Sequence, residues 1–170
     1  THTHTHTHFP GKHTNFELGT RVPMIIRAPG ISPSVVDGLV ESVDLYPTIA
    51  ELAGLSKPDD LDGINLESLM TKESEHLKDA VFSEYPRCPS NLSEPWSDRT
   101  SCVFTNRSNF TAMGYSVRTK HWRYTVWLHW DGTNLVGDFD RVIAEELYEH
   151  QDDDGTNFDR FENVNVVDFD

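Results

Sequence analysis

Two runs rich in aromatic and β-branched residues, Ala112 to Arg118 and Trp122 to Trp130, constrain the fold of this chain most strongly. Only Thr119, Lys120 and His121 separate the runs, and such an arrangement is typical of an antiparallel hairpin. Successive side chains of a strand point to opposite faces. The second run therefore predicts one face with Trp122, Tyr124, Val126 and Leu128, and another with Arg123, Thr125, Trp127 and His129.

Shorter patterns predict the elements before and after this hairpin. Apolar residues from Val22 to Ile26 form a short run that Pro29 and Gly30 stop, which favours a buried strand. From Ser42 to Ala53 the apolar residues recur at helical spacing, and Gly54 follows as a candidate C-cap. This pattern predicts a helix of about ten residues with one face in the core.

Three further elements have weaker signals in the sequence. Leu66, Leu69 and Met70 predict one short helix. Ala80 to Tyr85 predicts a strand that Pro86 ends, and Glu146 to His150 predicts another strand. Several strands with little helix between them indicate a small antiparallel sheet beside an α/β segment.

The charge of the chain restricts its partners. The chain carries 14 basic and 28 acidic residues, for a formal net charge of -14. A chain so acidic would repel a phosphate backbone or an anionic membrane surface, so we expect no nucleic-acid and no membrane partner. No stretch approaches the roughly 18 apolar residues that a membrane-spanning helix needs.

The two cysteines lie in a polar loop that is also rich in N-glycosylation sequons. Cys88 and Cys102 are candidates for a disulfide, and two free buried thiols are the alternative. The sequons begin at Asn91, Asn106 and Asn109. Together these features favour an oxidising, glycosylating compartment.

The sequence holds no self-contained catalytic motif of the common kinds. It contains no H-E-x-x-H, no G-x-S-x-G and no Walker loop. Cys88 precedes Pro89 and Ser90, and we interpret it as a loop cysteine. The acidic run from Asp152 to Asp154 suggests either a calcium loop or a solvated turn, and its spacing does not fit the EF-hand template.

A series of motifs resembles one enzyme family in order along the chain. Lys12 to Glu17 and Thr20 to Ile26 are similar to the K-x-x-N-F-E and T-R-V-P-L-I motifs of the sulfatase family. The further matches are Val43 to Thr48 with Leu52 to Leu55, Asp62 with Gly63, Tyr85 to Arg87, Met113 to Thr119, Arg123 to Thr125, and Glu146 to Tyr148 with Asn163 and Val164. The chain thus resembles a sulfatase from Lys12 to Val167, and most narrowly the iduronate-2-sulfatase group.

The resemblance implies a truncated α/β fold of the alkaline-phosphatase-like sulfatase type. We expect a remnant of the large α/β domain in residues 12–79 and a small antiparallel sheet subdomain in residues 80–170, with the cysteine and sequon loop at residues 86–110. Residues 1–11, with their Thr-His repeat, are expected to be a tag or an artefact, and a native metal site is the alternative. Without parallel-sheet neighbours, Val22 to Ile26 would be an exposed edge unless a partner chain, such as a missing N-terminal chain, covers it.

The resemblance also implies a catalytic mechanism, and this chain contains only part of the residues that the mechanism uses. Sulfatases attack the sulfate with a formylglycine made from cysteine, beside a divalent cation. Only Lys12 matches a residue of that site, where it binds the sulfate. We expect calcium in the full-length family, no metal bound to this fragment, and a sulfated glycosaminoglycan as the substrate of the full-length enzyme. The fragment alone is expected to be inactive, and a non-catalytic secreted binding domain is the alternative.

Two basic residues of the hairpin are weaker site candidates. Arg118 and Arg123 are expected near the substrate, because the second subdomain of the family helps to form the pocket wall. A buried or cross-strand salt bridge with a carboxylate is the alternative for both residues.

Overall fold

The computed structural model describes residues 13–89, 101–157 and 160–167. These residues form two compact units: residues 13–22 together with the described residues from Ser83 onward, and Pro23–Phe82. The Thr-His repeat, Lys12 and Asn91 lie outside the described residues. None of the described helices has the length and hydrophobicity to cross a lipid bilayer.

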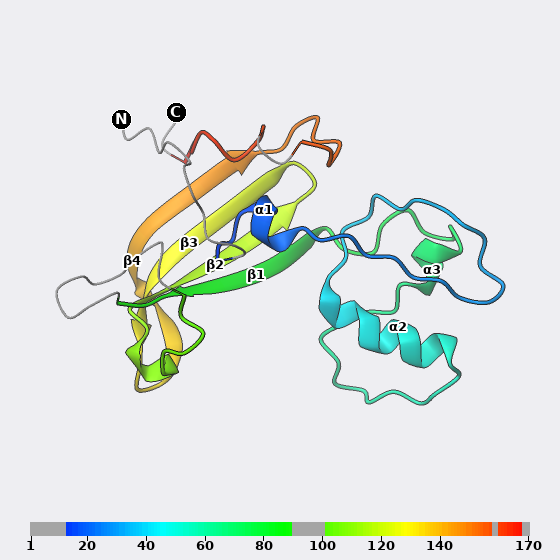
Figure 1. The fold of residues 1–170 in the computed structure, drawn as a ribbon, viewed down its shortest axis with the longest axis horizontal. Coiled ribbons are helices and arrows are strands. Elements are labelled where there is room, and N and C mark those ends of the chain that lie inside the picture. The colour runs from blue at the N-terminus through cyan, green and yellow to red at the C-terminus, as the bar shows by residue number, and fades with distance from the viewer. Residues whose placement is uncertain (1–12, 90–100, 158–159, 168–170) are drawn as a thin grey trace. The chain divides into compact units, whose positions relative to one another are not determined.

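The first unit is built on a four-stranded sheet with the order β1-β2-β3-β4 (Figure 1). The strands are β1 (Ala80–Arg87), β2 (Ala112–Thr119), β3 (Trp122–Asp131) and β4 (Val136–Glu149). The predicted hairpin is confirmed as β2 and β3, which pair antiparallel. The strand predicted at Glu146 to His150 is the end of the longer β4. Pro86 lies within β1 and does not end it, because β1 is an edge strand, where a missing N–H is tolerated.

One face of this sheet is buried, and it carries charged and polar residues as well as apolar ones. Along β3 the buried side chains include Arg123, Thr125 and Trp127, which alternate as predicted. Their partners in the register are Arg118, Ser116 and Gly114 on β2, so these six residues share one face. The short helix α1 (Glu17–Thr20) and the residues before it lie in the same unit and contact this face.

The second unit is helical and small. The helix predicted after Ser42 is confirmed as the 3₁₀ turn η1 (Ser42–Asp44) followed by α2 (Leu45–Leu52), and Gly54 follows with φ +66°. The short helix predicted around Leu69 is α3 (Glu67–Met70). Leu66 and Leu69 are buried, as is Asp44, whose carboxylate connects separate parts of the unit.

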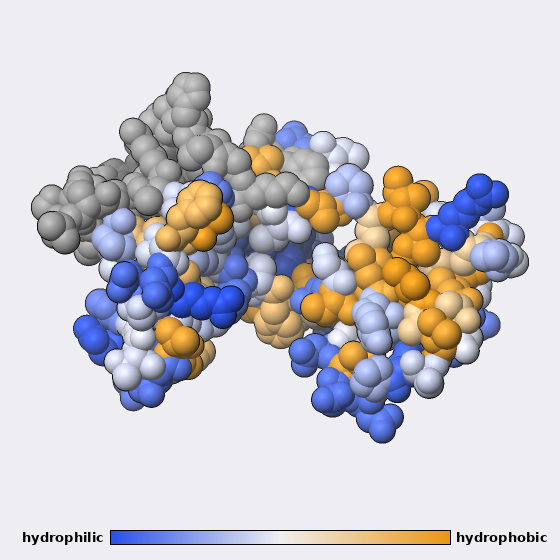
Figure 2. Space-filling view, turned by 60° about the horizontal axis from the view of Figure 1, so that its bottom comes forward, coloured by the Kyte–Doolittle hydropathy of each residue, from blue (hydrophilic) through white to orange (hydrophobic). Residues whose placement is uncertain are grey.

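Two expectations about burial and strand formation were wrong. Val22 to Ile26 forms no strand, and Ile25 is 93% exposed. The reason is that none of the described strands runs beside this segment, so its backbone groups have no ladder to join. The apolar stripe of α2 is also only partly buried, since Tyr46 and Ile49 are each 57% exposed. Figure 2 shows apolar residues gathered on the surface of this unit.

The structure also differs from the expected division of the chain at residue 79. Residues 13–22, which we expected to belong with an α/β remnant at residues 12–79, form a unit with the sheet instead. Contacts between His13–Glu17 and the sheet explain this difference.

Candidate functional site

The segment His13–Glu17, which directly follows Lys12, is seated on the buried face of the sheet. The His13 ring stacks on the Tyr85 ring of β1, with centroids 5.8 Å apart. The Arg87 guanidinium donates to the His13 carbonyl at 3.2 Å and lies 4.7 Å from the centre of the Trp127 ring. These contacts fix the backbone at the residue next to Lys12.

Asn15 and Phe16 extend this attachment across the sheet. The Asn15 amide donates to the Gly114 carbonyl of β2 at 2.9 Å, and Asn15 is buried. The Phe16 ring meets the edge of Tyr148 on β4 at a centroid distance of 5.6 Å. The segment therefore contacts β1, β2 and β4 within four residues of Lys12.

Position 114 must be glycine, because the segment His13–Glu17 and the Trp127 ring both lie very close to the backbone there. A Cβ at Gly114 would lie 2.8 Å from Asn15 Nδ2 and 2.8 Å from Trp127 Cζ3. Both distances are shorter than a van der Waals contact. The missing side chain thus makes room for the Trp127 ring and for the Asn15 amide over β2.

Glu17 ends the segment inside a buried group of charged side chains, which we call the Glu17 cluster. Its members are Glu17, Arg118, Arg123, His150, Asp153 and Glu162. Glu17 Oε2 accepts from Arg118 Nε at 3.2 Å and from Arg123 Nη2. The side chains of Glu17, Arg118 and Arg123 are only 7%, 8% and 3% exposed, so these ion pairs are shielded from water.

His150 and two further carboxylates complete the Glu17 cluster. His150 Nδ1 lies 2.8 Å from Asp153 Oδ2, and His150 Nε2 lies 3.1 Å from Glu162 Oε1. Asp153 also pairs with Arg118 at 3.3 Å, and Glu162 pairs with Arg123. The Glu17 backbone N–H donates to Glu162 Oε2 at 2.6 Å. The cluster therefore joins α1, β2, β3 and the chain after β4.

The electrostatic environment lowers the pKa of two carboxylates of the cluster, Glu17 and Asp153. Burial alone would raise the pKa of Glu17, but the charges of Arg118 and Arg123 outweigh burial and hold that pKa below its ordinary value. Burial likewise opposes ionisation of Asp153, and the His150 contact together with the Gly155 backbone N–H lowers the pKa of Asp153. Paired charges of this kind favour a structural role.

Three members of the cluster lie close enough together to suggest a metal site. The ligand atoms of Glu17, His150 and Glu162 all lie within 4.8 Å of one another. However, Glu17 Oε2 already accepts from both arginines, and Glu162 Oε1 accepts from Arg123. A calcium ion here would lie beside two guanidinium groups and would displace these bonds, so the three residues do not fit it.

The structure places the other predicted site residues as follows. Cys88 and Cys102 form a disulfide between β1 and the loop before β2. Asn106 and Asn109 are exposed at the 3₁₀ turn η2 (Arg107–Asn109). Arg118 and Arg123 lie together in the Glu17 cluster, in the buried salt bridges that were the alternative to a place near the substrate.

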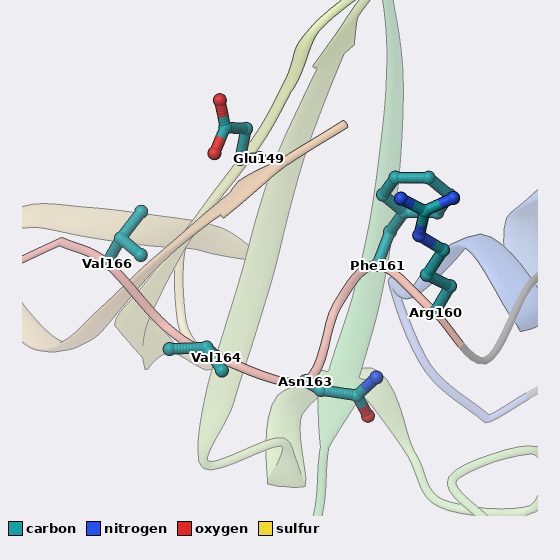
Figure 3. Close-up of a pocket in the computed structure, with 6 residues that line it drawn as sticks. All are labelled: Glu149, Arg160, Phe161, Asn163, Val164 and Val166. Carbon is teal, nitrogen blue, oxygen red and sulfur yellow. The ribbon is translucent and has the colours of Figure 1, made fainter. Parts of the chain in front are cut away.

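A shallow groove is formed by the end of β4 and the chain after it (Figure 3). Its volume is about 180 Å³, and it is lined by Glu149, Arg160, Phe161, Asn163, Val164 and Val166. The Arg160 guanidinium lies 5.1 Å from the centre of the Phe161 ring. Arg118 and Arg123 are not part of this lining.

Sequence reasoning missed which carboxylates pair with Arg118 and Arg123 in the Glu17 cluster. Asp153 belongs to an acidic run that reads as a solvated turn or a calcium loop, yet its side chain is only 4% exposed. The one available signal was the alternation in β3, which puts Arg123 on the same face as Trp127. A buried arginine requires a carboxylate partner, but the sequence does not say which carboxylate is near.

The sheet and the Glu17 cluster define a mixed α and β domain. Its described residues hold the segment His13–Glu17 in place and do not include a complete set of catalytic residues. Residues 5–130 match the family described as N-sulphoglucosamine sulphohydrolase, C-terminal, and the chain belongs to this family. The predicted sulfatase membership is confirmed.

Curated relatives carry sulfatase names. Iduronate 2-sulfatase of Mus musculus is 29% identical over 81% of this chain and 32% of the relative. Arylsulfatase K of Homo sapiens is 31% identical over 74% of this chain and 21% of the relative. The chain thus spans about a third or less of the curated relatives. A crystal structure of a proposed sulfatase from Bacteroides thetaiotaomicron has a TM-score of 0.43 and 22% identity, over 74% of this chain and 20% of that chain.

Proposed function

We propose that this chain is the C-terminal part of a sulfuric ester hydrolase that removes sulfate from glycosaminoglycans, and that Lys12 binds the sulfate. The observation that carries the proposal is the seating of His13–Glu17 on three strands of the sheet. When a lysine on a flexible segment binds sulfate, the ordering of the segment costs conformational entropy and weakens binding. This cost is smaller for a lysine that adjoins a fixed backbone. The family match and the similarity to iduronate 2-sulfatase support the substrate class.

In this proposal the sheet holds the sulfate-binding segment in place. Arg118 and Arg123 take part by pairing with Glu17, and so they act as positioning residues. Lys12 would donate hydrogen bonds to sulfate oxygens and offset the negative charge that develops during hydrolysis. Nucleophile and calcium ligands belong to the longer enzyme in this proposal, so the isolated chain has no turnover. The enzyme works in the lysosome or outside the cell.

Exposed apolar residues favour a second function, that of a non-catalytic secreted binding domain. In the Pro23–Phe82 unit, Ile25 is 93% exposed and Val35 is 88% exposed. Exposed apolar residues that gather on a surface mark interaction sites. A binding domain would use this surface for a protein partner and would not depend on Lys12.

A chimera distinguishes the two functions. This chain would replace the matching C-terminal region of mouse iduronate 2-sulfatase, and kcat/KM would be measured on a sulfated disaccharide. Lys12→Ala is expected to lower kcat/KM by about 100-fold or more, the cost of losing one transition-state donor. Lys120→Ala, an exposed lysine in the β2–β3 turn, is the matched control with unchanged kcat/KM.

Two outcomes would contradict the enzyme proposal. Equal kcat/KM for the Lys12→Ala and Lys120→Ala chimeras would remove the role of Lys12. A folded, secreted chimera without activity would favour the binding domain. Separately, the isolated chain with calcium and a fluorogenic sulfate ester is expected to show no turnover, and turnover would refute its inactivity.

A further inference from the structure

Two adjacent sequons share one short turn of the structure. Asn106-Arg107-Ser108 and Asn109-Phe110-Thr111 follow each other without a gap. Asn106 is the N-cap of η2, where its Oδ1 accepts from the Ser108 N–H at 3.1 Å, and Asn109 is the last residue of η2. The Asn109 N–H donates to the Asn106 carbonyl at 2.8 Å, which closes the turn. Both asparagines are exposed.

This turn is fixed to the sheet at several points. Trp130 at the end of β3 donates through Nε1 to the Arg107 carbonyl at 2.8 Å. The Phe110 and Trp130 rings lie 5.9 Å apart. A Cβ at Gly132 would lie only 2.0 Å from the Ser108 carbonyl oxygen, so the β3–β4 turn packs directly on η2. The two asparagines are therefore held in one relative position.

Asn106 and Asn109 are the two ends of one hydrogen-bonded turn, because the Asn109 N–H donates to the Asn106 carbonyl at 2.8 Å. The Cα atoms at the two ends of such a turn lie less than about 7 Å apart. An N-linked glycan is a bulky branched group on a surface loop. Two such groups, attached to the two ends of one turn that Trp130 fixes, would crowd each other.

We propose that η2 is an N-glycosylation site that takes a single glycan per molecule, on Asn106 or on Asn109 but not on both. This inference rests on the proposed secretory location and not on the proposed catalytic role. The neighbouring apolar residues give the glycan a function. Val103 is 72% exposed and Phe104 is 99% exposed, only a few residues before Asn106. A glycan on η2 covers this apolar tip and keeps it soluble.

Glycan counting on one peptide tests the proposal. The complete 170-residue chain would be secreted from eukaryotic cells behind a heterologous signal peptide, with Ser93→Ala to remove the third sequon. The cells are grown with a mannosidase inhibitor that keeps the glycans in the high-mannose form, and endoglycosidase H then leaves one N-acetylglucosamine at each occupied site. After reduction, cleavage at lysine releases residues 79–120 as one peptide, because Lys78 and Lys120 have no lysine between them. Mass spectrometry of intracellular and secreted chains then counts the sugars, so poor secretion does not prevent the measurement.

The variants remove each sequon but keep both asparagines. The parent peptide is expected to carry one N-acetylglucosamine, and Ser108→Ala and Thr111→Ala are each expected to carry one as well, on the remaining site. The double variant is expected to carry none. A parent peptide with two sugars would overturn the exclusion, and a parent peptide with none would overturn the site. A bare peptide from either single variant would also overturn the proposal, because only one asparagine would then be an acceptor.

Discussion

Arg118 lies directly opposite Arg123 in the register of β2 and β3. Like charges at opposing positions destabilise a sheet, and here both side chains are buried. Glu17 resolves this conflict, because its Oε2 accepts from both guanidinium groups. The two buried arginines of the hairpin thus need a carboxylate from the segment that follows Lys12. The ion pairs with Glu17 in turn hold this segment against the sheet.

Removing the charge of Glu17 should strongly destabilise the first unit. Glu17→Gln leaves Arg118 and Arg123 facing each other without their shared carboxylate, and we expect a loss of about 3–5 kcal/mol in the free energy of unfolding. Urea denaturation followed by tryptophan fluorescence measures this loss, because all four tryptophans lie after residue 83. Glu145→Gln, at an exposed residue of β4, is the control and should change the free energy by about 0.5 kcal/mol or less. Equal effects of the two changes would show that the Glu17 cluster contributes little.

The first unit should lose stability in acid. The pKa of Glu17 is lowered from its ordinary 4.5, and that of Asp153 is lowered from 3.8. A group with a lowered folded-state pKa stabilises the fold above its ordinary pKa, and this contribution is lost as the pH falls through the folded-state value. We expect the free energy of unfolding to be level above about pH 5 and to fall below it. Urea denaturation at a series of pH values from about 6 down to about 3 measures the profile. Asp153→Asn should reduce its slope, and an unchanged slope would contradict the assignment.

A side chain at position 114 should disturb the seat of the segment after Lys12. Gly114→Ala places a methyl group against Asn15 and Trp127, and we expect a cost of about 1–3 kcal/mol from overpacking. The loosened segment should also be cut faster by trypsin at Arg21. Timed digestion followed by mass spectrometry measures the cleavage rate, and Thr133→Ala in the exposed β3–β4 turn is the control. A cleavage rate equal to that of the control would show that Asn15 does not need this space.

The second unit should depend on one buried carboxylate. Asp44 accepts from the Ile64 N–H at 2.9 Å and from the Glu41 N–H at 2.8 Å, and it pairs with Lys78 at 2.8 Å. Asp44→Ala removes all three contacts, and we expect a loss of about 3–5 kcal/mol. Because this unit contains no tryptophan, hydrogen exchange of the amides at Glu41 and Ile64 is the measurement. Asp59→Ala, at an exposed residue, should leave both exchange rates unchanged.

Local patterns were sufficient to predict most elements of the fold. The hairpin follows from alternating β-branched and aromatic residues in β2 and β3, and α2 follows from its helical spacing and from Gly54. These patterns reflect the conformational preferences of neighbouring residues, so the hairpin and the helix can be predicted without knowledge of distant contacts. The motifs that identify the sulfatase family are likewise a property of the sequence alone.

Only the tertiary structure decided what the buried charges do. The sequence placed Arg123 on a strand face, but the fold selected Glu17 and Glu162 as its partners from residues 106 and 39 positions away. None of the described strands pairs with Val22 to Ile26, although their composition favours a strand. Strand pairing and side-chain burial depend on which distant segments contact each other in the fold. A local sequence pattern contains no information about these contacts.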